Sequence, residues 1–115
     1  MLPRDQQRLE CILDYCEQIE DTLSRFGRFK ETFLQDKDFQ QSIAFSILQI
    51  GELVGKLSPE LRSATAEKIN WPQIKGMRNI VVHDYGEIDH NIVWDVIMKD
   101  IPGLKAFCES ELPDL

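Results

Sequence analysis

The sequence predicts an all-α protein, a four-to-five-helix up-down bundle that forms a single domain over residues 1–115. Apolar residues recur at steps of three and four along most of the chain, and no segment shows the alternation of a half-buried strand. Glycine and proline fall between these periodic stretches, where connections are expected. With 115 residues, 43% of them hydrophobic, the chain suffices for one core and leaves no room for a second.

The first helix is expected over roughly residues 5–25, because one face collects a continuous apolar stripe. The stripe consists of Leu9, Ile12, Leu13, Cys16, Ile19, Leu23 and Phe26. Gly27 should end this helix, and Phe29, Phe33 and Leu34 suggest a short helical continuation before the polar QDKD stretch.

A second long helix follows, with apolar positions at near-heptad spacing. They are Phe39, Ile43, Ile47, Ile50, Val54 and Leu57. Pro59 stops it and starts a further short turn, with Ser58 as N-cap. Gly51 and Gly55 are expected to permit close helix packing rather than to bind phosphate, since no strand precedes them.

The sequence Asn70-Trp71-Pro72 repeats this capping pattern, so a third main helix is expected from Pro72 to about Asp84, with Gly86 ending it. Trp71 is expected to anchor a core or an interface, as is Trp94 further on.

Asp89 is the predicted N-cap of the last helix. Its stripe contains Val93, Val96, Ile97, Ile101, Leu104 and Cys108. Pro102 interrupts this stripe and should kink or split the helix, because proline removes one backbone donor and crowds the preceding turn.

The third helix carries an unusual polar group in the stretch GMRNIVVHDYG, residues 76–86. At about 100° per residue, one side of the helix is apolar and should face the core. This side holds Ile74, Met77 and Val81, with Ile80 beside them. Asn79 and His83 share the opposite face, and Arg78 lies about 140° from His83 around an ideal helix axis.

Each of these polar residues has an ordinary explanation alone, such as charge complementation of a helix C-terminus for His83. Together, His83, Arg78 and Tyr85 place a titratable imidazole, a phosphate-binding guanidinium and a phenol within eight residues. RNA cleavage through the 2′-hydroxyl needs an acid, a base and positive charge on the phosphate. The combination therefore indicates a site that handles phosphodiesters.

The net charge of −7 argues against a broad basic surface for nucleic acid, so any RNA contact must be local. A basic partner, or a basic patch assembled on oligomerisation, fits the same charge. Cys11, Cys16 and Cys108 have no metal-like spacing and are expected to be buried reduced thiols of a cytoplasmic protein. No stretch resembles a signal peptide or a membrane span.

The string R-N-I-V-V-H-D-Y, residues 78–85, matches the R-x4-H-x-Y signature of the HepT-like members of the HEPN superfamily. The flanking segments IGE (50–52), SPELR (58–62), WPQIKGMRN (71–79) and HDYGEID…IVWDVI (83–97) also resemble that family. The resemblance covers about residues 40–105 and agrees with the helical prediction.

The resemblance implies a HEPN-like fold, a homodimer, and a toxin that acts as a metal-independent endoribonuclease without a cofactor. Its partner would be a minimal nucleotidyltransferase antitoxin that adenylylates the motif tyrosine. His83 would then be the catalytic acid or base, Arg78 the phosphate-holding group and Tyr85 the modified residue. Asn79 receives a supporting role, and Asp84 none beyond an influence on the pKa of His83.

One histidine does not readily serve as acid and base at once. A two-fold dimer that packs the third helices together would bring two copies of His83 and Arg78 into one cleft. Glu52 could reach this cleft or pair with Arg78, although a structural role is the simpler expectation. The alternative is a non-catalytic helical module that binds a nucleotide or docks the nucleotidyltransferase; a metal site around His90 lacks a supporting cysteine cluster.

Overall fold

The computed structural model describes residues 1–82 and 88–112, and every regular element in these two ranges is helical. The elements are α1 (Pro3–Phe26), α2 (Lys30–Gln35), α3 (Lys37–Lys56), α4 (Pro59–Ala64), α5 (Trp71–Val82), α6 (His90–Asp95), the π-helical segment η1 (Val96–Asp100) and α7 (Ile101–Glu111). The all-α prediction is confirmed.

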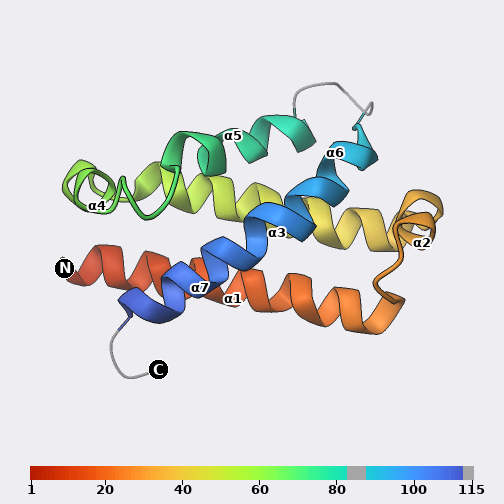
Figure 1. Cartoon of the computed structure of the whole chain (residues 1–115), viewed down its shortest axis with the longest axis horizontal. Coiled ribbons are helices and arrows are strands. Elements are labelled where there is room, and N and C mark those ends of the chain that lie inside the picture. Colours follow the sequence, from red (N-terminus) through yellow and green to blue (C-terminus); the bar gives the residue numbers. More distant parts are fainter. Residues whose placement is uncertain (83–87, 113–115) are drawn as a thin grey trace.

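Four long elements make the bundle: α1, α3, α5 and the continuous run of α6, η1 and α7. Successive elements in this order run in opposite directions (Figure 1). α3 lies between α1 and α5 and packs against both, and α7 packs on α1. The short helices α2 and α4 sit at opposite ends of α3 (Figure 1). This arrangement places α5, with the Arg78 motif, on one side of the molecule.

The ends of α1 follow from its sequence. Pro3 occupies the first turn, where a backbone N–H would have no acceptor within the helix, so proline loses no hydrogen bond there. Gly27 ends the helix with φ of 95°, a conformation that glycine adopts without the steric cost of a side chain. The predicted boundaries at residues 5 and 25 were therefore close to the observed ones.

Two capping predictions are confirmed: Ser58 caps α4 by accepting from the N–H of Leu61 (3.1 Å), and Asp89 caps α6. A further cap was not predicted. Asp36 accepts a hydrogen bond from the backbone N–H of Phe39 at the start of α3 (3.1 Å).

Pro102 interrupts the last helix as predicted, and the structure shows how. The segment just before it, Val96–Asp100, winds as a π-helix. The backbone N–H of Ile101 donates to the carbonyl of Val96, five residues back, instead of to the residue four back. Because Pro102 has no N–H to continue the α-helical ladder, the widened turn accommodates its ring without breaking the apolar stripe.

The core gathers the predicted stripes of all the long helices. Both tryptophans belong to it, Trp71 at 4% and Trp94 at 8% relative exposure, so they anchor the core of a single chain. Trp94 packs against Phe33, with ring centroids 5.5 Å apart. Across the described part of the chain, no helix is both long and apolar enough to cross a bilayer.

The cysteines are free thiols, but the expectation that all three are buried was wrong for Cys11, which is exposed. Residue 11 lies between the buried positions of Leu9 and Ile12 and turns outward on α1. Burial raises the pKa of Cys108 to about 12 and also raises the pKa of Cys16, which makes both unreactive.

Candidate functional site around Arg78

α5 presents Arg78 and Asn79 to solvent because its opposite side is held in the core. Ile74 and Met77 are buried at 5% and 1% exposure, while Ile80 and Val81 are partly buried against the same core, as predicted. Asn70 fixes the start of this helix by accepting from the N–H of Gln73 (3.1 Å). Arg78 and Asn79 then have to emerge on the outer surface, and both are exposed.

Two of the predicted site residues, His83 and Tyr85, lie outside the described residues, as do Asp84 and Gly86. The description of α5 ends at Val82, one residue before the motif histidine. Of the predicted site, the structure therefore places Arg78 and the supporting Asn79 side by side on the last turns of α5.

α3 approaches α5 very closely beneath Arg78. A Cβ placed on Gly51 would lie 2.7 Å from the Cβ of Arg78 and 3.4 Å from its Cα, so only glycine fits there without movement of a helix. The prediction of close packing is confirmed at this position. Gly55 differs, because a Cβ there would meet only the flexible end of Lys75 at 3.7 Å. The expectation was thus right for Gly51 and wrong for Gly55.

Glu52, the residue after this glycine, forms an ion pair with the Nε of Arg78. Both side chains are about half exposed, 46% for Arg78 and 44% for Glu52, so the pair contributes only about 0–1 kcal/mol to stability. Its effect is one of orientation. A contact at Nε leaves the two terminal nitrogens of the guanidinium to bind a phosphate in the forked geometry that arginine favours.

A surface groove of about 550 Å³ opens beside this ion pair, between α3 and α5. Its lining contains Gly51, Glu52, Gly55, Lys56, Pro72, Lys75, Gly76, Arg78 and Asn79. Three of these side chains are cationic and one is anionic. Glycines at three positions keep the groove shallow, so a backbone phosphate could come close to α3 and α5.

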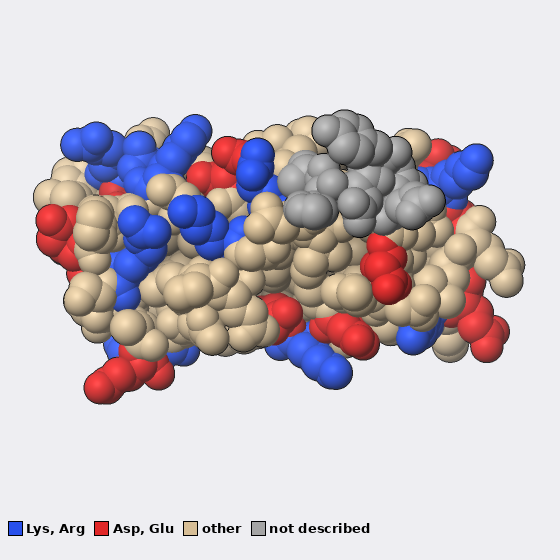
Figure 2. Space-filling view, turned by 90° about the horizontal axis from the view of Figure 1, so that it is seen from above, with Lys and Arg blue, Asp and Glu red and all other residues tan. Residues whose placement is uncertain are grey.

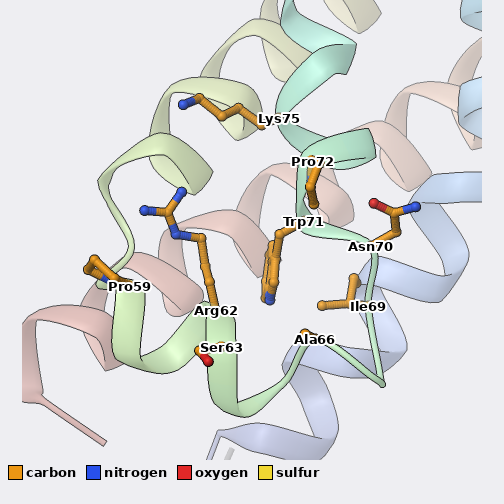
Figure 3. A pocket seen from close by; sticks show the side chains of 9 residues that line it. All are labelled: Pro59, Arg62, Ser63, Ala66, Ile69, Asn70, Trp71, Pro72 and Lys75. Atoms are coloured by element: carbon orange, nitrogen blue, oxygen red, sulfur yellow. The ribbon is translucent and has the colours of Figure 1, made fainter.

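A second hollow of about 670 Å³ adjoins the groove, since Pro72 and Lys75 line both. Figure 3 shows the charged ends of Arg62 and Lys75 on the same side of this hollow, with the Trp71 indole at its wall. Sequence reasoning missed both cations. Arg62 lies on α4 and Lys75 on α5, and the path of the turn between these helices cannot be predicted from the sequence. Each residue nevertheless falls in a segment that resembles the HepT-like family.

The two hollows together create a local positive surface on an acidic protein. Their lining carries four cations, Lys56, Arg62, Lys75 and Arg78, and one acid, Glu52. Figure 2 shows lysine and arginine gathered over the α4 end of this face. A chain with 20 acidic and 13 basic residues thus carries, among its described residues, a local region of positive charge that would attract a polyanion.

Among the described residues, no group of three His, Cys, Asp or Glu side chains is placed to hold a metal ion. His90 lies at the start of α6, where its ring packs edge-on against Phe33 with centroids 5.8 Å apart. This histidine belongs to the core side of α6 rather than to the Arg78 groove.

Comparison with known proteins gives a consistent result. The model of the family described as "Ribonuclease HepT-like" matches residues 12–111. "Putative RNase TTE0752" of Caldanaerobacter subterraneus subsp. tengcongensis is 34% identical over 97 residues, which cover 84% of each chain. "Probable ribonuclease HepT" of Thermococcus cleftensis is 29% identical over 102 residues, covering 84% of this chain and 92% of that protein. No solved structure matches significantly.

Proposed function

We propose, from the premise that this chain belongs to the Ribonuclease HepT-like family, that it is the toxin of a prokaryotic toxin–antitoxin pair and a metal-independent endoribonuclease. The observation that carries the proposal is the position of Arg78. Its guanidinium is exposed at a cation-lined groove, held through Nε by Glu52, five residues before His83 in the chain.

The reaction needs little beyond the residues of the motif. His83 removes the proton from the 2′-hydroxyl, which attacks the adjacent phosphorus as the bond to the 5′-oxygen breaks, and an acid protonates that leaving oxygen. Arg78 stabilises the extra negative charge on the phosphate in the transition state. Asn79, one residue further along α5, supports the bound strand by hydrogen bonding.

Acid and base are supplied together if the active form is a homodimer. In this arrangement the α5 surfaces of two chains meet across a two-fold axis, and the one shared cleft receives a histidine and an arginine from both chains. The exposure of Arg78 and Asn79 is compatible with such an interface, because neither side chain is locked inside the bundle.

The test of catalysis is cleavage of a structured RNA in the presence of EDTA by wild type and by His83→Ala. The chain provides a matched control, because His90 is its only other histidine. We expect wild type and His90→Asn to cut the RNA and His83→Ala to lose cleavage by at least about 100-fold. Equal cleavage by His83→Ala and wild type would overturn the assignment, and RNA binding without cleavage would favour the non-catalytic docking module.

We further propose that a cognate minimal nucleotidyltransferase silences the enzyme by adenylylating Tyr85. The phenolic oxygen attacks the α-phosphorus of ATP and displaces pyrophosphate, and the proton passes to solvent. The adenylate brings a negative charge that would counter the positive charge of Arg78, and a bulk that would take space needed by RNA, so charge and volume both exclude the substrate.

Mass spectrometry after incubation with the proposed cognate nucleotidyltransferase and ATP tests this half of the proposal. Tyr15 is the only other tyrosine and serves as the control. Whole adenylate increments should appear on wild type and on Tyr15→Phe but not on Tyr85→Phe. Increments that persist in Tyr85→Phe would place the modification elsewhere.

A further inference from the structure

The hollow between α4 and α5 has features that the proposed catalytic site does not use. Arg62 and Lys75 line it and, among the residues that the structure describes, no acid does, although acids outnumber bases in the chain. It adjoins the groove of Arg78 through Pro72 and Lys75, which line both. A strand bound at Arg78 would therefore find further positive charge along the same face.

We propose that this hollow is a second phosphate subsite, in which Arg62 and Lys75 hold the backbone of single-stranded RNA at a phosphate away from the one that is cut. The proposal rests on the proposed ribonuclease function. The ligand is a phosphodiester of the same strand, and the subsite positions the substrate without taking part in the chemistry.

Arg62 supports this assignment by its unsatisfied donor. Its Nε is buried and finds no hydrogen-bond partner within the part of the chain that the structure describes. A buried N–H without an acceptor costs about 1–3 kcal/mol, and a phosphate oxygen that the Nε reached after a small movement of the side chain would be an acceptor of suitable charge. Figure 3 shows the guanidinium directed toward the same side as the ammonium of Lys75.

Two hydrogen bonds hold the wall of the hollow together, which favours a preformed site. The indole Nε1 of Trp71 donates to the hydroxyl of Thr65 (2.8 Å), and Thr65 in turn donates to the carbonyl of Leu61 (2.7 Å). These two bonds connect the start of α5 to α4 across the turn, so the two helices that carry Arg62 and Lys75 are tied to each other. Binding then costs little reorganisation.

The same geometry predicts that the subsite does not distinguish between bases. Trp71 is only 4% exposed, so it cannot offer a face on which a base stacks. Recognition is limited to backbone charge and to the polar groups of Ser63 and Asn70 at the rim. The subsite should therefore strengthen binding to many RNA sequences equally and leave base preference unchanged.

Binding is measured by fluorescence anisotropy with a single-stranded RNA of about 12 nucleotides, in a His83→Ala background that keeps the RNA intact. Lys75→Gln and Arg62→Gln should each weaken binding several-fold and reduce the salt slope by about 0.7 between about 50 and 200 mM salt. Lys75 is exposed, so Lys75→Gln keeps the test valid even if Arg62→Gln fails to fold. The control is Lys30→Gln with Lys37→Gln, which lowers positive charge near α2, at the other end of α3.

Cleavage assays separate this proposal from the proposed function. With His83 intact, Arg62→Gln should raise the KM for the longer RNA and leave kcat/KM for a dinucleotide substrate unchanged, because Arg62 lines the hollow and not the groove of Arg78. A wild type that cuts neither substrate would overturn the ribonuclease function, and anisotropy would still decide on the subsite. Binding by Lys75→Gln equal to that of the control would overturn the subsite, as would a Lys75-dependent site that takes AMP but not RNA.

Discussion

Gly51 on α3 and Arg78 on α5 are in such close contact that a methyl group on the glycine would lie 2.7 Å from the arginine Cβ. The backbone of α3 at Gly51 thus packs directly against the base of the Arg78 side chain, which is the residue proposed to hold the phosphate. Any displacement of α5 relative to α3 moves Arg78 directly.

Gly51→Ala should therefore reduce stability and activity together. The added methyl overpacks the α3–α5 contact, at a cost of about 1–3 kcal/mol in the free energy of unfolding. The shift of α5 should also lower RNA cleavage, because the guanidinium moves from its position beside Glu52. Urea unfolding and a cleavage assay below the unfolding transition measure the two effects separately.

Gly103→Ala is the matched control, since Gly103 is also helical and a Cβ there would meet nothing within 4 Å. Alanine should stabilise that helix by up to about 1 kcal/mol through its higher helix propensity and leave cleavage unchanged. If Gly51→Ala behaves like Gly103→Ala, the close contact does not constrain the site.

Substitution of Arg78 should affect catalysis far more than folding. The Glu52 ion pair is half exposed, so Arg78→Gln should change the free energy of unfolding by less than about 1 kcal/mol. Cleavage should fall by about 100-fold or more, because the transition state loses its positive charge. Arg78→Lys keeps the positive charge but loses the forked geometry, so its cleavage activity should lie between those of wild type and Arg78→Gln. Circular dichroism melts and kcat/KM values test these expectations; a large loss of stability in Arg78→Gln would indicate a structural arginine instead.

Mixing two inactive variants tests whether the site is shared between chains. Arg78→Ala and His83→Ala homodimers should each be inactive. After subunit exchange, the mixed dimer holds one arginine from one chain and one histidine from the other, so weak cleavage should return, below that of wild type because the second histidine is missing. If no activity returns although native mass spectrometry shows mixed dimers, one arginine and one histidine from separate chains do not complete a working site. A variant that carries both substitutions in the same chain, taken through the same exchange procedure, controls for contaminating nuclease.

Asp5 should make folding sensitive to acid. It is 2% exposed and accepts hydrogen bonds from the backbone N–H (2.9 Å) and hydroxyl (2.5 Å) of Ser58. Burial raises the pKa of Asp5, but the bonds from Ser58, together with Arg8 and Arg4, outweigh it, so the pKa lies below its ordinary value of 3.8. The carboxylate therefore contributes its full stability above about pH 4 to 5 and loses it as the pH falls through the lowered pKa.

Asp5→Asn should cost about 1.5–3 kcal/mol at pH 7, because Ser58 loses a charged acceptor at the junction of α1 and α4. The difference in the free energy of unfolding between wild type and Asp5→Asn should shrink as the pH falls from about 5 to about 2. Thermal melts across this range measure it. Asp14→Asn, an exposed carboxylate on the same helix, should show no such convergence.

The sequence alone determined most of the helical architecture. Apolar periodicity located every long helix, and capping residues such as Ser58 and Asp89 located their starts, because these signals depend on a few neighbouring residues. The interruption of the helix at Pro102, seen as the π-helical segment before it, was predictable for the same reason, as proline acts on its own turn. The R-x4-H-x-Y string is likewise a local signal, and it predicts the family to which the chain belongs.

The tertiary structure decided which of the chain's charges share a surface. Nothing local in the sequence distinguishes Gly51, which α5 approaches closely, from Gly55, which remains open, because the difference depends on where two helices cross. The same holds for Arg62 and Lys75, which become neighbours only after the turn between α4 and α5 folds back. Charge composition predicted an acidic molecule, and only helix packing placed four of its cations around one pair of hollows.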